Sequence, residues 1–230
     1  MAITTTLVRE NMYILDDGRV RCFLFVGDDS ALLVDTAFPD SDIASVVKDI
    51  TSLPVKVVLT HGDGDHTGGV KSFGECYVHA GDESLLAPDI TKHELKDGDI
   101  LSVGEFCFEV IHIPGHTYGS VAFLEKEKRF ILTGDGVQKN GPIFMFGDKR
   151  NFPLYLESLE RLDAMKDQFD LIYPSHNVYP LTTDAIRNCI KDATAVYEGK
   201  ITSSEKHPFM PCNIYHGSYT GYLFQPETKQ

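Results

Sequence analysis

The segment LTHGDGDHTGG, residues 59–69, concentrates two histidines and two aspartates within six positions. These residues are His61, Asp63, Asp65 and His66. Imidazole nitrogens and carboxylate oxygens are the ligands that suit zinc, iron and manganese. Glycines in the loop are expected to let the backbone turn sharply enough to aim these side chains inward. They are Gly62, Gly64, Gly68 and Gly69. The pattern indicates half of a metal-binding site.

Four further polar residues follow segments that are typical of β-strands. Asp35 ends the run LLVD, His116 lies in IPGHTYGS, Asp135 in LTGDG and His176 in YPSHN. Side chains at the ends of several strands can converge on one point, as a metal site requires. For each residue alone, a helix cap or a bond within a turn is an equally good interpretation. The combination favours a metal centre.

The predicted elements that carry these residues begin with adjacent antiparallel strands over residues 12–35. In that region β-prone runs alternate with Asp-Gly and Gly-Asp-Asp turn signals. Apolar residues at helical spacing predict a helix over residues 40–53, and the apolar run VKVVLT that follows is expected to be a buried strand. A hairpin with a charged turn is predicted over residues 121–135.

Two more helices are predicted, over residues 153–169 and 182–200, on either side of the apolar strand DLIYP. Helices spread across both halves of the chain suggest central sheets with helices outside. The segment at about 200–230 is rich in proline, glycine and aromatic residues and is expected to be irregular. No linker is evident, so residues 1–230 are expected to form a single domain.

The motifs resemble those of the metallo-β-lactamase fold superfamily, and of its glyoxalase II-like branch in particular. That family has a strand-end aspartate, then HxHxDH, PGHT, GD and a final histidine. The similarity runs from about residue 7 to 177, in the family's order and at plausible spacing. It implies an α/β fold with four layers, αββα, in which two central mixed sheets are flanked by helices.

The resemblance also implies two divalent metal ions, with zinc first and iron or manganese as alternatives. Asp135 would bridge the ions, and Asp65 would also orient the nucleophile as the catalytic residue. Asp35 and His112 match positions that are not ligands in the family. The implied ligands are His61, Asp63 and His116 for the first ion and Asp65, His66 and His176 for the second.

The sequence departs from the family at position 63, where an aspartate replaces the second histidine of the motif. If Asp63 coordinates, the first set has two imidazoles and one carboxylate, as in non-heme iron sites. Three aspartates and a hydroxide would then neutralise two divalent ions, whereas a histidine at position 63 would leave one positive charge. The alternative is that Asp63 turns outward and one ion is missing.

Composition limits the classes of partner. The 230 residues carry a formal charge of −13, which repels phosphate backbones, so no nucleic-acid partner is expected. The N-terminus lacks a secretion signal and no segment approaches the ~20 apolar residues of a membrane span, so we expect a cytoplasmic protein without membrane contact. The five scattered cysteines are expected to be reduced. Nothing indicates the oligomeric state.

Together these features predict a metal-dependent hydrolase. A metal-bound hydroxide would cleave a small-molecule ester, thioester or lactone. The principal alternative is a non-heme iron oxidoreductase of the same fold, either persulfide dioxygenase-like or diiron, and a metal-binding module without catalysis is a third. Residues close to the ligands in sequence either line the pocket or have ordinary loop roles: Tyr118, Lys139, Asn140 and Tyr179.

Overall fold

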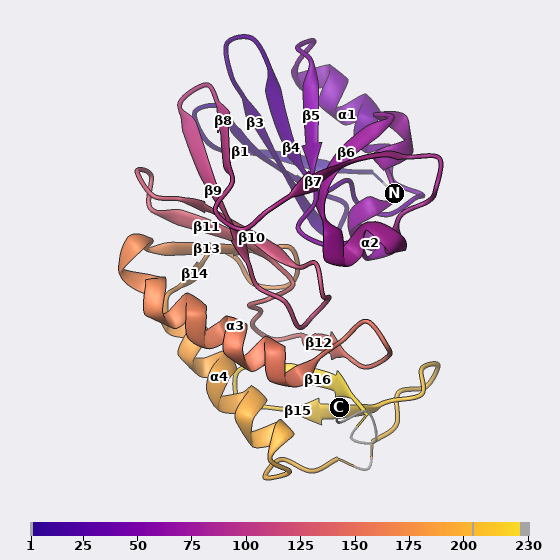
Figure 1. Ribbon diagram of the computed structural model, residues 1–230, viewed down its shortest axis with the longest axis vertical. Coiled ribbons are helices and arrows are strands. Elements are labelled where there is room, and N and C mark those ends of the chain that lie inside the picture. Colours follow the sequence, from indigo (N-terminus) through magenta and orange to yellow (C-terminus); the bar gives the residue numbers. More distant parts are fainter. Residues whose placement is uncertain (1, 204, 226–230) are drawn as a thin grey trace.

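In the computed structural model, which describes residues 2–203 and 205–225, the N-terminal half of the chain folds into a seven-stranded mixed sheet (Figure 1). The first four strands are antiparallel and the last four are parallel. In spatial order they are β1 (Thr4–Arg9), β2 (Met12–Asp16), β3 (Arg21–Val26), β4 (Ala31–Val34), β5 (Val55–Val58), β6 (Glu75–His79) and β7 (Thr91–Leu95). The predicted antiparallel strands are confirmed as β2, β3 and β4.

A second mixed sheet has six strands, of which β11 and β13 are parallel and the other neighbours antiparallel. In spatial order they are β14 (Leu181–Thr182), β13 (Leu171–Pro174), β11 (Phe130–Gly134), β10 (Val121–Glu125), β9 (Phe106–His112) and β8 (Ile100–Val103). The predicted hairpin is confirmed as β10 and β11.

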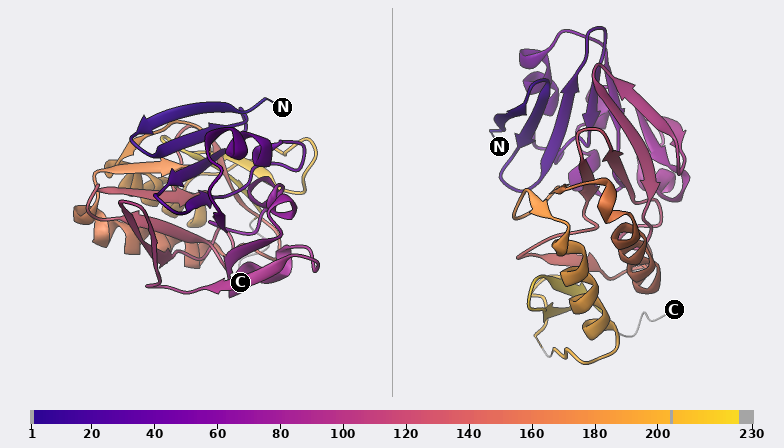
Figure 2. Two further views of the ribbon diagram at one scale, coloured as in Figure 1. Left: turned by 90° about the horizontal axis from the view of Figure 1, so that it is seen from above. Right: turned by 90° about the vertical axis from the view of Figure 1, so that its left-hand side faces the viewer.

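Three hydrophobic cores separate four layers, which confirms the αββα arrangement (Figure 2). Phe25 and Phe108, from the two facing sheets, meet in the central core with ring centroids 4.7 Å apart. The outer face of the first sheet packs against α1 (Ile43–Ile50). The outer face of the second packs against α3 (Phe152–Met165) and α4 (Asp184–Tyr197).

Shorter helical segments lie in the connections: α2 (Gly64–Thr67), η1 (Val70–Ser72), η2 (Ala80–Leu85) and η3 (Lys166–Gln168). Asp42 caps α1 by accepting the Ser45 N–H at 3.2 Å. Among the described residues, no helix combines the length and the apolar character that a membrane crossing requires.

The C-terminal segment differs from the expectation of irregular structure. Residues 213–216 and 221–224 form the hairpin β15 (Asn213–His216) and β16 (Gly221–Phe224), and β16 pairs in parallel with β12 (Pro142–Met145). This third sheet lies at the end of the molecule opposite α1 (Figure 1). The expectation was wrong there because the proline, glycine and aromatic content of the segment hid a local hairpin, and because β12, the strand that β16 pairs with, is far away in sequence.

Candidate metal centre

The seven predicted ligands lie together on loops that follow strand ends. His61 and Asp63 follow β5, His116 follows β9, Asp135 follows β11 and His176 follows β13. Three overlapping groups of possible ligand atoms occur, and within each group the atoms lie within 4.8 Å of one another. Together the groups include all seven predicted ligands: His61, Asp63, Asp65, His66, His116, Asp135 and His176. Their convergence is a finding of the structure, whereas their roles as ligands remain predictions.

The first set consists of His61, Asp63 and His116. The Nε2 atoms of the two histidines are 3.2 Å apart. Asp63 Oδ2 lies 3.5 Å from His61 Nε2 and 3.2 Å from His116 Nε2. Asp63 therefore points inward, and the outward alternative is wrong.

The second set consists of Asp65, His66 and His176. Asp65 Oδ2 lies 3.5 Å from His66 Nε2 and 3.3 Å from His176 Nε2. Asp65 and His66 are neighbours in α2 and His176 follows β13, and the three ligand atoms lie within 4.8 Å of one another. This set has one carboxylate and two imidazoles, like the first.

Asp135 lies between the two sets. Its Oδ2 is 3.7 Å from His116 Nε2, while its Oδ1 is 3.4 Å from His66 Nε2 and 3.2 Å from His176 Nε2. Among the described residues, Asp135 Oδ1 and His66 Nε2 are buried without a hydrogen-bond partner. Buried polar atoms normally have a partner, so these orphaned atoms and their donor types fit a divalent cation.

The four histidines all turn Nδ1 away from the centre toward an outer partner. His116 Nδ1 bonds the Phe144 carbonyl at 3.0 Å, and His176 Nδ1 bonds the Arg19 carbonyl at 2.7 Å. Because a carbonyl only accepts, each Nδ1 carries a proton, and Nε2 is the nitrogen that faces the centre. This orientation is the one that a metal ligand needs.

Asp35 positions the other two histidines, His66 directly and His61 through Thr60. It accepts His66 Nδ1–H at 2.8 Å and the Thr60 hydroxyl at 2.7 Å on Oδ2, and the Thr60 N–H at 2.8 Å on Oδ1. The Thr60 oxygen in turn lies 3.0 Å from His61 Nδ1. Asp35 is fully buried, has φ +64° and belongs to no ligand group, in keeping with the predicted supporting role.

The carboxylates make this cluster attract positive charge. Burial alone lowers the pKa of His176, but the negative charge of Asp135, together with the nearby Asp65 carboxylate, raises it to about 10. Burial also opposes the charged form of His66, yet Asp35 and Asp135 hold its pKa well above the ordinary value. A divalent cation would supply the positive charge that these groups favour.

Gly68 and Gly69 serve close packing and not the sharp turns that we expected from the sequence, whereas a Cβ on Gly64 would meet nothing within 4 Å. A Cβ on Gly68 would lie 2.3 Å from the Phe38 carbonyl carbon, and one on Gly69 would lie 2.4 Å from Ile43 Cγ2. Neither residue has a positive φ. The loop therefore needs glycine because it passes directly against the chain that follows β4 and enters α1.

Arg150 is the functional residue that the sequence analysis missed. Its Nη2 lies 2.6 Å from Asp63 Oδ2, across 87 positions of the chain. The predicted neutral centre is corrected accordingly, because the guanidinium adds one positive charge beside the first set. The only signal in the sequence was the extra carboxylate at position 63. Its negative charge favours a neighbouring cation, but the sequence does not identify that residue.

A cavity of about 500 Å³ opens over both ligand sets. Its apolar wall comes from Phe38, Pro142 and Phe144, and Gln138 and Asn177 add amide groups. The pocket-lining alternative was wrong for Tyr118, Lys139, Asn140 and Tyr179, which do not line this cavity. Closeness to the ligands in sequence did not predict the lining, because β12 of the third sheet supplies Pro142 and Phe144 to the cavity wall.

Asp82 is a second residue that the sequence did not reveal. This buried carboxylate accepts the Gly62 N–H and the Gly119 N–H, each at 2.8 Å, and the Thr117 hydroxyl at 2.5 Å. It therefore ties together the two loops that carry the histidines of the first set. It sits in the short turn η2, where its sequence context resembles an ordinary capping residue.

The remaining histidines lie outside the centre. His112 bonds the Tyr118 carbonyl at 2.9 Å and stacks on His79, with ring centroids 3.9 Å apart, and it belongs to none of the three groups of possible ligands among the described residues. His216 is exposed and pairs with Glu205 at 2.8 Å, so it does not cover the cavity. All five cysteines are free, as expected.

Comparison with known proteins agrees with this geometry. The sequence model of the family described as the Metallo-beta-lactamase superfamily matches residues 15–80 and 77–176. An atrochrysone carboxyl ACP thioesterase from Aspergillus aculeatus is 30% identical over 74% of this chain and 51% of its own length. A hydroxyacylglutathione hydrolase from Bdellovibrio bacteriovorus is 28% identical over 71% of this chain and 64% of its own length. The chain thus spans about half to two thirds of these relatives, both of which are hydrolases by name.

Among solved structures, the DIM-1 metallo-beta-lactamase has a similar fold. It superposes with a TM-score of 0.72 at 16% sequence identity, covering 85% of this chain and 98% of that one. At this identity the similarity concerns the fold alone.

Proposed function

Because this chain belongs to the metallo-beta-lactamase superfamily, we propose that it is a metal-dependent hydrolase of small thioesters, with esters and lactones as related substrates. The observation that carries the proposal is the pair of ligand sets that share Asp135 beneath one cavity. This arrangement of donors suits two divalent ions, with zinc first and iron or manganese as alternatives.

The donor sets divide the work of holding the ions. His61, Asp63 and His116 would hold one, and Asp65, His66 and His176 the other, with Asp135 between them. Bound divalent cations supply a nucleophilic water near neutral pH and polarise the carbonyl under attack. With such a water as the nucleophile, the reaction needs no serine or cysteine nucleophile.

Asp65 is assigned to orient the attacking water and receive its proton. Its side chain keeps 24% of its surface exposed and lines the cavity, so it can reach a water beside the substrate. Burial opposes its ionised form, but the neighbouring His176 and His66 hold its pKa below the ordinary value. The carboxylate is therefore ready to accept a proton at neutral pH.

The cavity wall suits an acyl group of modest size. Phe38 and Phe144 offer apolar contact to the acyl group, and the carbonyl end of the substrate would face the ligands. Thioesters lead the proposal because both relatives act on a thioester according to their names. Water adds to the carbonyl carbon, the C–S bond breaks, and the thiolate leaves with the proton from Asp65.

The test is hydrolysis by protein stripped with a chelator and reloaded with zinc, manganese or iron in turn. Substrates are an acylglutathione, an N-acetylcysteamine thioester, p-nitrophenyl acetate and γ-butyrolactone. We expect thiol release that requires a metal and falls at least 100-fold in Asp65→Asn. Asp148→Asn, an exposed acid of the neighbouring loop, should match wild type. Turnover that survives both the chelator and Asp65→Asn would refute the proposal.

The two-histidine, one-carboxylate composition of the first set keeps the iron oxidoreductase as the rival. Its signature would be stoichiometric iron in protein purified without added metal, together with oxygen uptake on a persulfide substrate. Zinc or manganese with thioester turnover and no oxygen uptake supports the hydrolase instead.

A further inference from the structure

One oxygen of the Asp63 carboxylate contacts both the candidate metal ligands and an arginine. Oδ2 is the atom that lies 3.2 Å and 3.5 Å from the Nε2 atoms of His116 and His61, and the same atom accepts Arg150 Nη2 at 2.6 Å. A cation bound by the first set would share this oxygen with a guanidinium. Such sharing lowers the charge that the carboxylate offers to the ion.

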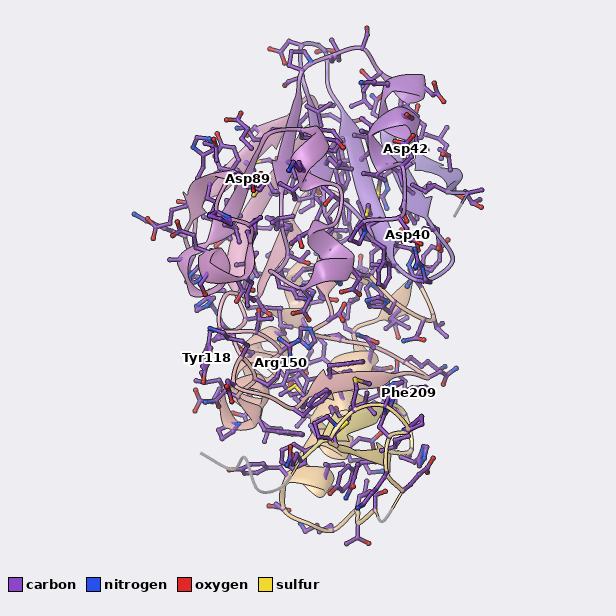
Figure 3. The ribbon with its side chains drawn as sticks, turned by 90° about the vertical axis from the view of Figure 1, so that its right-hand side faces the viewer. Asp40, Asp42, Asp89, Tyr118, Arg150 and Phe209 are labelled. Atoms are coloured by element: carbon purple, nitrogen blue, oxygen red, sulfur yellow. The ribbon has the colours of Figure 1, made fainter. Side chains whose placement is uncertain are left out.

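Arg150 is held in this position by the loop around it. Its side chain keeps only 11% of its surface exposed, and among the described residues Nε and Nη1 are buried without hydrogen-bond partners. The next residue, Asn151, caps α3 through Leu154 N–H and donates its own N–H to the Gly115 carbonyl at 2.8 Å. Arg150 is thus anchored between α3 and the loop of His116, near the middle of the long axis of the molecule (Figure 3).

The second set has no such cation. Among the described residues, the ion pairs of Asp65 and Asp135 involve histidines alone. Arg19 also lines the cavity, but its Nη2 lies 2.8 Å from Asp17 and 2.7 Å from Asp40. The positive charge of Arg150 therefore offsets the one carboxylate of the first set, whereas among the described residues no arginine or lysine pairs with the one carboxylate of the second set, and Asp135 is common to both sets.

We propose that Arg150 is a positioning residue that offsets the charge of Asp63, so that the two ligand sets take up divalent cations unequally. The set of Asp65, His66 and His176 with Asp135 fills first, and the set of His61, Asp63 and His116 fills last and more weakly. The inference rests on the cation binding in the proposed function. It concerns this chain's own pair of residues at positions 63 and 150.

The experiment is a Zn²⁺ titration of cation-free full-length protein against a chromophoric chelator. Wild type should bind two ions with dissociation constants at least tenfold apart. In Arg150→Met the weaker step should tighten at least tenfold while the stronger step stays within threefold. Lys149→Met removes the same charge from the adjacent, exposed position and should leave both steps within threefold of wild type.

A second pair of variants keeps the test decisive if Arg150→Met folds poorly, as circular dichroism would show. Asp63→His leaves Arg150 without its carboxylate partner and should weaken the weaker of the two Zn²⁺-binding steps at least tenfold. Asp63→His combined with Arg150→Met should return the weaker step to within threefold of wild type, because the lost negative and positive charges cancel. An Arg150→Met step that is unchanged or weaker, or a double variant that binds as weakly as Asp63→His alone, overturns the inference. If wild type binds no Zn²⁺ at all, the proposed function itself fails.

Discussion

Replacing Asp35 by asparagine should weaken both the fold and the metal centre. The carboxylate accepts three hydrogen bonds of 2.7–2.8 Å from His66 and Thr60 in a fully buried position. Asparagine tolerates the left-handed backbone at φ +64°, so the substitution changes charge and hydrogen bonding without adding backbone strain. Its amide nitrogen would face donors and leave at least one of them unpaired.

The magnitude follows from these contacts. A hydrogen bond to a charged group contributes about 1.5–3 kcal/mol, so Asp35→Asn should lower the free energy of unfolding by about 2–4 kcal/mol. In a chain of this size that corresponds to a drop in Tm of roughly 5–15 °C. Asp35→Ala should cost about 1–2 kcal/mol more, because alanine is strained in the left-handed region. Loss of the partner of His66 should weaken the second set about 10–100-fold for Zn²⁺.

Urea unfolding of cation-free protein and chelator competition for Zn²⁺ measure the two effects separately. Asp42→Asn is the matched control, because Asp42 is an exposed helix cap and asparagine caps equally well. If Asp35→Asn unfolds within 0.5 kcal/mol of wild type and binds Zn²⁺ within threefold, the reasoning about the buried hydrogen bonds is wrong.

Three further outcomes are expected. Asp82→Ala should lower the free energy of unfolding by about 3 kcal/mol or more in urea, since it orphans buried donors that include the N–H groups of Gly62 and Gly119; an unchanged midpoint would contradict this. In cation-free protein, His176 has its pKa raised from 6.5 to about 10, so its contribution is full below pH 6.5 and is lost as the pH rises toward 10. Asp135 has its pKa lowered well below 3.8, so its contribution is present above that pH and is lost on acidification. Tm should therefore peak between about pH 4 and 6.5, and a rise toward pH 10 would count against these shifts. Finally, a chelator should remove about 4 kcal/mol of stability from protein held at a thousandfold excess of Zn²⁺ over Kd, seen as a lower Tm, and no change in Tm would mean that the folded state does not bind the ion.

The sequence by itself determined the local parts of this protein. Alternating apolar runs and turn residues predicted β2 to β4 and the hairpin of β10 and β11, because these pairings join neighbouring segments. The ligand types also stood out, since histidines and aspartates beside glycines at strand ends are chemically conspicuous. Side chains at the ends of several strands can converge on one point, so the sequence predicted that these residues meet, although they follow β5 of one sheet and β9, β11 and β13 of the other.

Tertiary structure alone decided the features that join distant segments. Arg150 meets Asp63 across 87 positions, and β12 meets β16 near the end of the described chain. A charge or an edge strand can pair with many candidates in the sequence, and packing selects one of them. For this reason the motif predicted a metal centre, whereas the cation beside Asp63 and the strand that walls the cavity emerged only from the fold.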